Sequence, residues 1–368
     1  MRKSLYAAAL LVVSTPLMAQ TFVYVSEADD GTVARYALNE QNGALQLLDH
    51  TAAGGKVMPM ALSADGHLLY TAVRSTPFKL MSWRINPQTG ALSKDGEVPA
   101  AASYPWVSTD KQGRFLLTAS YDSDVVDVYR LAENGQVIAP PAGRYKTGHA
   151  AHSAVVDASG KNVYVGNLGT DRVLQLTLSQ EGELSALGSG FVSTAAENGP
   201  RHSVMSPDNR YLYNLGEMGG IITQFKRAAN GKLVKVMETA NAVAAQYHLA
   251  HGIERTASYN DTTPRIWAAD IHITPDGQFL YVSERTSSTI TGYQVSRSDG
   301  KLTLVGSWQV EKQPRSMDIT ADGRWLVASG EKSAVIGSYA IDPQSGALKR
   351  VGEAPVGGDA NWVTTVTY

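Results

Sequence analysis

Hydrophobic and polar positions alternate along this chain in short runs, which predicts β-strands throughout. From Thr21 onward one order recurs: an apolar strand, a Ser/Thr-x-Asp-Gly turn or a relative of it, and a second strand rich in Tyr, Leu and Val. A polar link, an alternating third strand and a weaker fourth strand follow. Pro, Asx and Gly residues form tight turns, so the first two strands of each unit are expected to form a hairpin. No stretch after residue 19 has sustained helical periodicity.

The turns recur at a nearly constant spacing. Successive turns lie about 46 to 49 residues apart, except for one interval that contains about 20 extra residues. The turns are Ser63–Gly66, Asp110–Gly113, Asp157–Gly160, Ser206–Asn209, Thr274–Gly277 and Thr320–Gly323. A four-stranded unit with a period of 40–50 residues is typical of a β-propeller blade.

The two ends of the chain each carry part of a further blade. Six complete units fit between about Met58 and Glu353, which leaves Phe22–Val25 with two following strands and, at the other end, Trp362–Val366. We therefore predict an all-β, seven-bladed propeller of four-stranded blades. The ring is closed by a blade shared between the termini, with the C-terminal strand innermost. Such closure removes an open sheet edge that would invite aggregation.

Composition and charge narrow the possible partners and the location. The 368 residues carry a net charge of −2, which argues against nucleic acid as a partner. Residues 1–19 have the layout of a secretory signal peptide: Arg2 and Lys3, the apolar run Leu5–Val13, and Ala19 before the cleavage point. The apolar run is too short to span a bilayer, so we expect no stable membrane association. We predict a periplasmic protein whose residues 20–368 form one domain, held by core burial because there is no Cys.

Strand order assigns the candidate side chains to one mouth of the channel. If each innermost strand starts at the top, the links between blades and the links from second to third strands lie there too, whereas the Asp-Gly turns lie at the bottom. The upper links carry His152, Arg201, Asp270, Arg315, Arg74, Tyr121, Asn167, Glu217, Arg285 and Glu331. The insertion at residues 240–265 joins two blades on the same side. It is expected to form a flap over the mouth, or else a solvated loop.

These residue types indicate a site for an anionic or oxyanion-forming substrate. Arg201 and Glu217 come together at the open end of one hairpin, where a structural salt bridge is the alternative interpretation. The sequence contains no Cys nucleophile, no G-x-S-x-G, no H-E-x-x-H and no phosphate-binding glycine loop. Asp270 and His272 share one face of a strand, but a single such pair is weak evidence for a metal. We expect no metal and no cofactor.

Four blocks of sequence resemble one known family. They are Gly199–His202, Trp267–Gly277, Glu284–Thr286 and Gln313–Arg315. The chain resembles the propeller-type lactonases over essentially all of residues 21–368. That group includes bacterial 6-phosphogluconolactonase and is similar to the fungal carboxy-muconate cyclase. The resemblance implies a catalytic set of a His, two Arg and a Glu, which by motif fall on His152, Arg201, Glu217 and Arg285.

The resemblance implies hydrolysis of a sugar lactone. Because the signal-peptide pattern indicates export, we expect glucono-1,5-lactone to be hydrolysed to gluconate in the periplasm. Glu217 is expected to act as general base toward water and His152 as proton donor to the ring oxygen, although the two roles can be exchanged. Arg201 and Arg285 are expected to stabilise the oxyanion. The expected substrate-binding residues are Arg74, Tyr121, Asn167, His202, Asp270, His272 and Arg315.

Two alternatives stay open. The first is a 6-phosphogluconolactonase in which Arg74 or Arg315 holds the phosphate. The signal peptide and the insertion depart from the cytoplasmic enzymes, and they argue against this substrate. The second alternative is a non-catalytic propeller that binds a protein or a saccharide on its top face. The sequence makes no prediction of oligomeric state.

Overall fold

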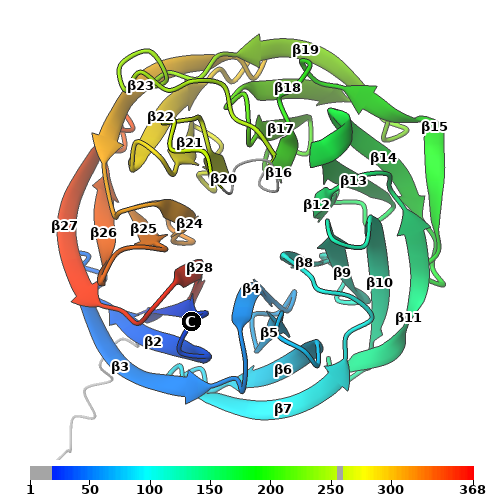
Figure 1. Ribbon diagram of the computed structural model, residues 1–368. Helices are drawn as coiled ribbons and strands as arrows, with labels where there is room; N and C mark the ends of the chain where they lie inside the picture. Colours follow the sequence, from blue (N-terminus) through cyan, green and yellow to red (C-terminus); the bar gives the residue numbers. More distant parts are fainter. Residues whose placement is uncertain (1–18, 255–259) are drawn as a thin grey trace, which may run out of the picture.

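Seven four-stranded antiparallel sheets surround a central channel (Figure 1). They are formed by residues 19–254 and 260–368, which are the residues that the computed structural model describes. Tight turns join consecutive strands, so each repeat starts at the channel and moves outward strand by strand. The predicted all-β, seven-bladed propeller is confirmed.

Both ends of the chain build one blade, in the order β28–β1–β2–β3. Its strands are β1 (Thr21–Glu27), β2 (Thr32–Leu38), β3 (Leu45–Ala52) and β28 (Ala360–Thr367). β28 pairs antiparallel with β1, and two backbone hydrogen bonds of 3.0 and 3.1 Å between Gln20 and Tyr368 extend the pairing. In Figure 1 the red C-terminal strand lies on the channel side of the blue N-terminal strands. The predicted shared blade is confirmed.

The other six blades follow the chain in order, each from the channel outward. The first two contain β4 (Val57–Leu62), β5 (Leu68–Val73), β6 (Lys79–Ile85) and β7 (Leu92–Pro99), then β8 (Trp106–Thr109), β9 (Phe115–Ser120), β10 (Val125–Leu131) and β11 (Val137–Lys146). The next two contain β12 (Ala151–Val156), β13 (Asn162–Asn167), β14 (Arg172–Leu178) and β15 (Leu184–Ser193), then β16 (Pro200–Met205), β17 (Tyr211–Gly216), β18 (Ile222–Arg227) and β19 (Leu233–Thr239). The last two contain β20 (Ala268–Ile273), β21 (Phe279–Glu284), β22 (Thr289–Val295) and β23 (Leu302–Gln309), then β24 (Pro314–Ile319), β25 (Trp325–Gly330), β26 (Val335–Ile341) and β27 (Leu348–Pro355). A short 3₁₀ helix, η1 (Leu168–Thr170), follows β13.

The hydrophobic core lies between the blades. Every residue of the second strands β5, β9, β13, β17, β21 and β25 is buried. Neighbouring blades cover both faces of these strands, which is why their sequences are almost continuously apolar. Phe22 and Tyr24 of the shared blade pack in one cluster with Leu69 and Trp83 of the next. Apolar burial of this kind holds a ring that contains no Cys.

A repeated hydrogen bond joins neighbouring blades on the lower side of the ring. In five blades of the described ring, a second-strand Tyr hydroxyl donates to the carbonyl of a turn Gly in the following blade, over 2.6–2.8 Å. The pairs are Tyr24–Gly90, Tyr70–Gly135, Tyr164–Gly231, Tyr213–Gly300 and Tyr281–Gly346. Gly90 has φ +69°, and a Cβ there would lie 2.4 Å from Phe22. The turn between third and fourth strands therefore requires glycine.

The upper mouth is the end of the channel where the innermost strands begin. The insertion between β19 and β20 lies at this end, as predicted: Gly252 N donates to Met218 O over 2.9 Å, and Ala250 forms an isolated bridge with Arg265. Residues 255–259 of the insertion lie outside the described residues. So does the predicted signal peptide, except for Ala19. Across the described ranges, no helix is long and apolar enough to cross a membrane.

Candidate active site

β-bulges at the upper mouth aim the candidate side chains. Among the described strands, six of the seven innermost ones carry one extra residue near the upper end. These bulges fall at Met58–Pro59, His152, Arg201, Ala269–Asp270, Arg315 and Asn361. A bulge breaks the alternation of a strand and re-aims its side chains. Arg201 and the adjacent His202 consequently both lie buried at the channel, although neighbours on a regular strand point to opposite faces.

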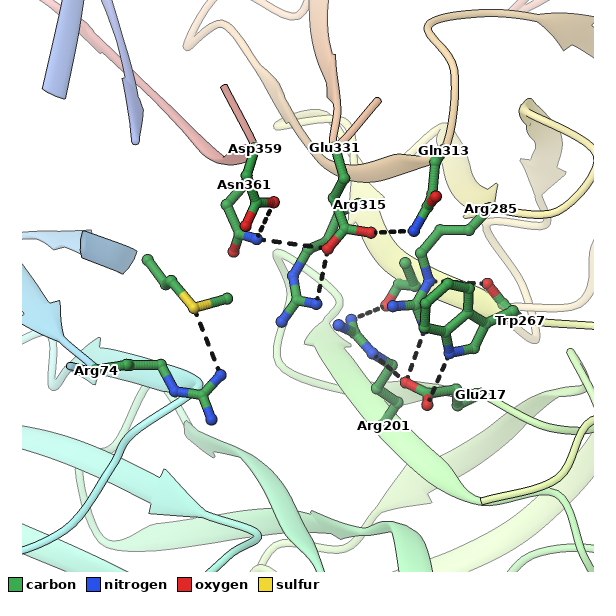
Figure 2. Close-up of polar contacts among 12 residues, drawn as sticks. Arg74, Arg201, Glu217, Trp267, Arg285, Gln313, Arg315, Glu331, Asp359 and Asn361 are labelled. Atoms are coloured by element: carbon green, nitrogen blue, oxygen red, sulfur yellow. Dashed lines mark hydrogen bonds and ion pairs between the residues drawn. The ribbon is translucent and has the colours of Figure 1, made fainter. Parts of the chain in front are cut away.

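Glu217 is the centre of the polar cluster (Figure 2). Its Oε2 accepts from Arg201 Nε over 2.7 Å and lies 2.9 Å from Arg285 Nη2. Its Oε1 accepts from Trp267 Nε1 over 3.2 Å. Burial alone would raise the pKa of Glu217, but the charges of Arg285 and Arg201 outweigh burial and lower the pKa to about 2. Glu217 is therefore an ionised carboxylate with both oxygens in use.

Each of these two arginines keeps one amino group free. Arg201 also donates through Nη1 to the Ala269 carbonyl and to His202 Nε2, so its Nη2 has no partner among the described residues. Arg285 donates through Nε to Trp267 O and through Nη2 to Ala268 O, which leaves its Nη1 free within the same ranges. The Arg285 guanidinium also stacks on the Trp267 ring, 3.8 Å from its centroid. Both arginines line the cavity, so fixed, unpaired N–H donors face it.

Arg315, on β24 of the blade that follows the one with Arg285, brings a third guanidinium to the channel (Figure 2). Its Nη1 donates to Glu331 Oε1 over 3.1 Å, and Gln313 Nε2 holds the other Glu331 oxygen over 2.6 Å. Arg315 Nε is buried without a partner in the described structure. Nearby carboxylates outweigh the effect of burial and raise the pKa of Arg315, so it is a cation at any working pH.

His152 faces this cluster as a neutral ring. It stacks on Tyr121 with centroids 5.7 Å apart, and its Nδ1 is buried without a hydrogen-bond partner among the described residues. Burial, and then the charge of Arg201, holds the pKa of His152 well below 6.5. A neutral, unpartnered imidazole in a cavity wall is available to exchange a proton with a bound ligand.

These groups surround a cavity of about 290 Å³ at the upper mouth. Its inner wall is formed by His152, Arg201, Glu217, Trp267, Arg285 and Arg315, and its outer wall by Tyr121, Asp122, Asp124, His149, Ala150, Leu168 and Glu254. The outer wall is acidic, because three carboxylates lie there with one exposed imidazole. Arg74 does not line the cavity: its Nε donates to Ser103 Oγ and its Nη2 contacts Tyr121 and Asp122.

Several residues expected to bind substrate lie outside the cavity wall. His202 and Asp270 lie beneath Arg201, and His272 lies beyond Asp270, with its Nε2 3.3 Å from Asp270 Oδ2. The Asn167 side chain donates to Thr147 O and Gly148 O and accepts from Thr170 Oγ1, so it fixes the link above β13. Of the eleven expected site residues, the structure brings six into the cavity wall, namely Tyr121, His152, Arg201, Glu217, Arg285 and Arg315. Substrate contacts for the other five stay predictions that this arrangement does not favour.

Sequence reasoning did not assign Trp267, Glu254, Asp122 or Asp124 to the site. Trp267 directly precedes β20, in the same inter-blade position that supplies other cavity residues, and that position was the available signal. Glu254 comes from the insertion, which has no counterpart in the other repeats to compare it with. Within the described ranges, no group of three or more His, Asp or Glu side chains is arranged to hold a metal ion.

Comparison with known proteins identifies the family. Residues 21–365 match the family model described as Lactonase, 7-bladed beta-propeller. The chain is 36% identical over 296 residues to a 6-phosphogluconolactonase of Serratia proteamaculans, covering 80% of this chain and 84% of the relative. It is 34% identical over 300 residues to the one of Pectobacterium carotovorum, covering 81% and 84%. The chain belongs to this lactonase family, which confirms both the resemblance and the expectation of an enzyme.

Solved structures share the fold. A periplasmic gluconolactonase of Pseudomonas aeruginosa superimposes with a TM-score of 0.80 at 22% identity, covering 95% of this chain and 99% of that one. A putative 6-phosphogluconolactonase of Bacteroides uniformis gives a TM-score of 0.80 at 24% identity, with coverages of 94% and 99%. At these identities the likeness supports the propeller architecture alone.

Proposed function

We propose that this protein hydrolyses the 1,5-lactone of a six-carbon aldonic acid to the open-chain acid. The observation that carries the proposal is a pair of amino groups, Arg201 Nη2 and Arg285 Nη1, that share the cavity wall with the imidazole of His152. None of the three has a hydrogen-bond partner among the described residues. Ring opening requires a nucleophilic water, donors for the oxyanion, and a proton for the departing ring oxygen. The cavity wall offers a group for each requirement.

The geometry favours the exchanged assignment of base and acid. Glu217 is a weak base because its pKa is about 2 and both of its oxygens accept hydrogen bonds. His152 is neutral and can take the proton from water as the water oxygen attacks the lactone carbon. The negative charge of the new oxyanion offsets the positive charges of Arg201 and Arg285. Before the oxyanion forms, these positive charges disfavour protonation of His152.

The tetrahedral intermediate then collapses. The bond between the former carbonyl carbon and the ring oxygen breaks, and His152 returns its proton to that oxygen, which leaves as a hydroxyl. The immediate product is the neutral hydroxy acid, and the imidazole is neutral again; the carboxyl group then releases its own proton to solvent and becomes a carboxylate. Glu217 stays ionised throughout and fixes the two arginines, with Arg315 as a further cation for the intermediate.

Two substrates fit this chemistry. The relatives at 34–36% identity are named 6-phosphogluconolactonases, which favours the phosphorylated lactone. The outer wall favours the free lactone, because Asp124 and Glu254 would repel a phosphate dianion, whereas Arg74 offsets the charge of Asp122 at 3.5 Å. The signal-peptide pattern of residues 1–19 points the same way, since free aldonolactones arise outside the inner membrane.

Comparing kcat/KM for glucono-1,5-lactone and its 6-phosphate tests the proposal. Hydrolysis is followed with a pH indicator and corrected for spontaneous ring opening. We expect a higher kcat/KM for the free lactone; a clear preference for the phosphate would assign the chain the activity named for its relatives. Lactone decay that pure protein leaves unchanged would refute both substrates. Mass spectrometry of exported protein tests the periplasmic location, because residues 1–19 should be absent.

A further inference from the structure

His202 holds one edge of the Arg201 guanidinium. Arg201 Nη1 donates to His202 Nε2 over 3.1 Å, while Nε of the same group donates to Glu217 Oε2 over 2.7 Å. Arg201 is only 1% exposed, so water does not replace these acceptors. The direction of the free Nη2 is therefore set by the groups that hold the other two nitrogens.

The hydrogen bond from Arg201 requires one tautomer of His202. The guanidinium is always a donor, so Nε2 must present its lone pair and the ring proton must lie on Nδ1. Nδ1 is 2.8 Å from Asp270 Oδ1, a carboxylate oxygen that can only accept. Burial, and then the charge of Arg201, lowers the pKa of His202 to about 3, which keeps the ring neutral. Asp270 thus selects the tautomer that accepts from Arg201.

Asp270 is itself fixed by two blades. Its Oδ1 accepts from the backbone N of Ile271 over 3.0 Å, and its Oδ2 accepts from the backbone N of Met317, on β24, over 3.1 Å. Burial alone would raise the pKa of Asp270, but the charge of His272 and the hydrogen bond from His202 hold it well below 3.8. A carboxylate held by backbone donors of β20 and β24 cannot turn to follow a moving histidine.

Aromatic rings lock the plane of His202. The centroid of Trp106 lies 4.7 Å away at 68°, that of His152 5.2 Å away at 62°, and that of Trp362 5.7 Å away at 56°. His202 is 1% exposed and does not line the cavity, so it has no direct access to substrate.

We infer that His202 and Asp270 are a positioning pair, which aims Arg201 Nη2 at the oxyanion without touching the substrate. This inference rests on the proposed function. It replaces direct substrate binding as the role of both residues. It also explains why a histidine and an aspartate are buried directly below the reacting groups, at positions where apolar residues would pack well.

Two substitutions of His202 separate positioning from packing. His202→Gln and His202→Met have similar volumes, and both lose the Nδ1 hydrogen bond to Asp270. Only Gln offers an oxygen where Nε2 stood, so only Gln can still accept from Arg201. We expect kcat to fall about 10–100-fold in His202→Met, the value of one hydrogen bond to a charged group, with KM nearly unchanged. In His202→Gln we expect kcat within about 5-fold of wild type.

Tyr213→Phe is the matched control. It removes a buried 2.7 Å hydrogen bond to Gly300 O from the same β16–β17 hairpin, at the end away from the cavity. It should lower Tm without changing kcat per folded molecule. Equal losses of kcat in His202→Gln and His202→Met would overturn the inference. The inference would also be overturned if the loss of kcat in each His202 variant simply paralleled its decrease in Tm.

The tautomer provides a readout that does not depend on turnover. Nitrogen NMR of the histidine rings should show His202 protonated at Nδ1 and unprotonated at Nε2 in the wild-type protein. A proton on Nε2 would overturn the inference even if every lactone is hydrolysed. Conversely, wild-type protein that hydrolyses no lactone refutes the proposed function, while the NMR result still decides the arrangement of Asp270, His202 and Arg201.

Discussion

Arg201 Nε donates to Glu217 Oε2 over 2.7 Å across the open end of the β16–β17 hairpin, and the same oxygen lies 2.9 Å from Arg285 Nη2. One carboxylate therefore compensates two buried cations. A charge shared in this way makes Glu217 poor at taking a proton but effective at fixing two guanidinium groups.

Substituting Glu217 distinguishes these roles. In Glu217→Gln the two arginines lose their counter-charge, so we expect a lower Tm, and kcat/KM lower by about 10–100-fold because the oxyanion donors are no longer fixed. We also expect gluconate to bind more tightly, because the free cations attract its carboxylate. Titration calorimetry with gluconate measures this effect. Unchanged gluconate affinity would mean that Glu217 does not compensate the charges of the two arginines.

The double variant that combines Arg201→Met with Glu217→Gln tests whether the two side chains act together. The two residues act on one transition state, so the loss in the double variant should be smaller than the product of the single losses. Fully multiplicative losses would mean that the two side chains contribute independently, contrary to the hydrogen bond between them.

His152→Phe should uncouple stability from activity. Phenylalanine keeps the stacking on Tyr121 and removes the buried, unpartnered Nδ1, so Tm should stay the same or rise. Loss of the proton carrier should lower kcat about 10²–10⁴-fold. Thermal unfolding and lactone turnover are measured on the same preparation. A variant that keeps kcat would remove His152 from the mechanism, whatever its Tm.

The proximity of Arg201 and Glu217 was predictable because it depends on local chain geometry. The turn Ser206–Asn209 fixes the hairpin, and a hairpin brings the residues before and after it together. The same reasoning correctly placed the shared blade, because each chain end carried an incomplete set of strands. Periodicity and turn residues are local signals, and their repetition from blade to blade makes them recognisable in the sequence.

The contact between His202 and Arg201 was not predictable in this way. A regular strand would turn His202 away from Arg201, and only the bulge at Arg201 brings both to the channel. Bulges depend on pairing between strands, which alternation along one strand does not reveal. Glu254 was missed for a related reason: it reaches the cavity from the insertion, whose path is set by contacts such as Gly252 with Met218.

Removal of the last strand tests closure of the ring. Deleting residues 362–368 takes most of β28 away from β1 and removes the Tyr368 hydroxyl, which donates to Gly66 O over 2.6 Å. The exposed backbone of β1 would be left unpaired, so we expect insoluble or strongly destabilised protein. Tyr368→Phe is the milder control and should stay soluble. Wild-type Tm in the truncated protein would contradict a closed ring.

His272 should make stability depend on pH in the alkaline range. Its ring lies between two carboxylates, with Nε2 3.3 Å from Asp270 Oδ2 and Nδ1 3.5 Å from Asp318 Oδ1. Burial alone would lower the pKa of His272, but the charge of Asp270 raises it from 6.5 to about 9. Because the folded value exceeds the unfolded one, the stabilisation is complete below about pH 6.5 and is lost as pH rises through about 9.

The difference in Tm between wild type and His272→Gln measures this contribution. The neutral amide keeps hydrogen-bonding capacity but has no charge, so the difference should be largest near pH 6 and should shrink steadily toward pH 10. Tyr213→Phe provides the reference, since its lost hydrogen bond to Gly300 lies away from these carboxylates and its Tm difference should not vary between pH 6 and 9. If the His272→Gln difference is equally constant, then His272 is not the bridging cation between Asp270 and Asp318. The two carboxylates must then be held by their other donors, which include His202 and Thr365.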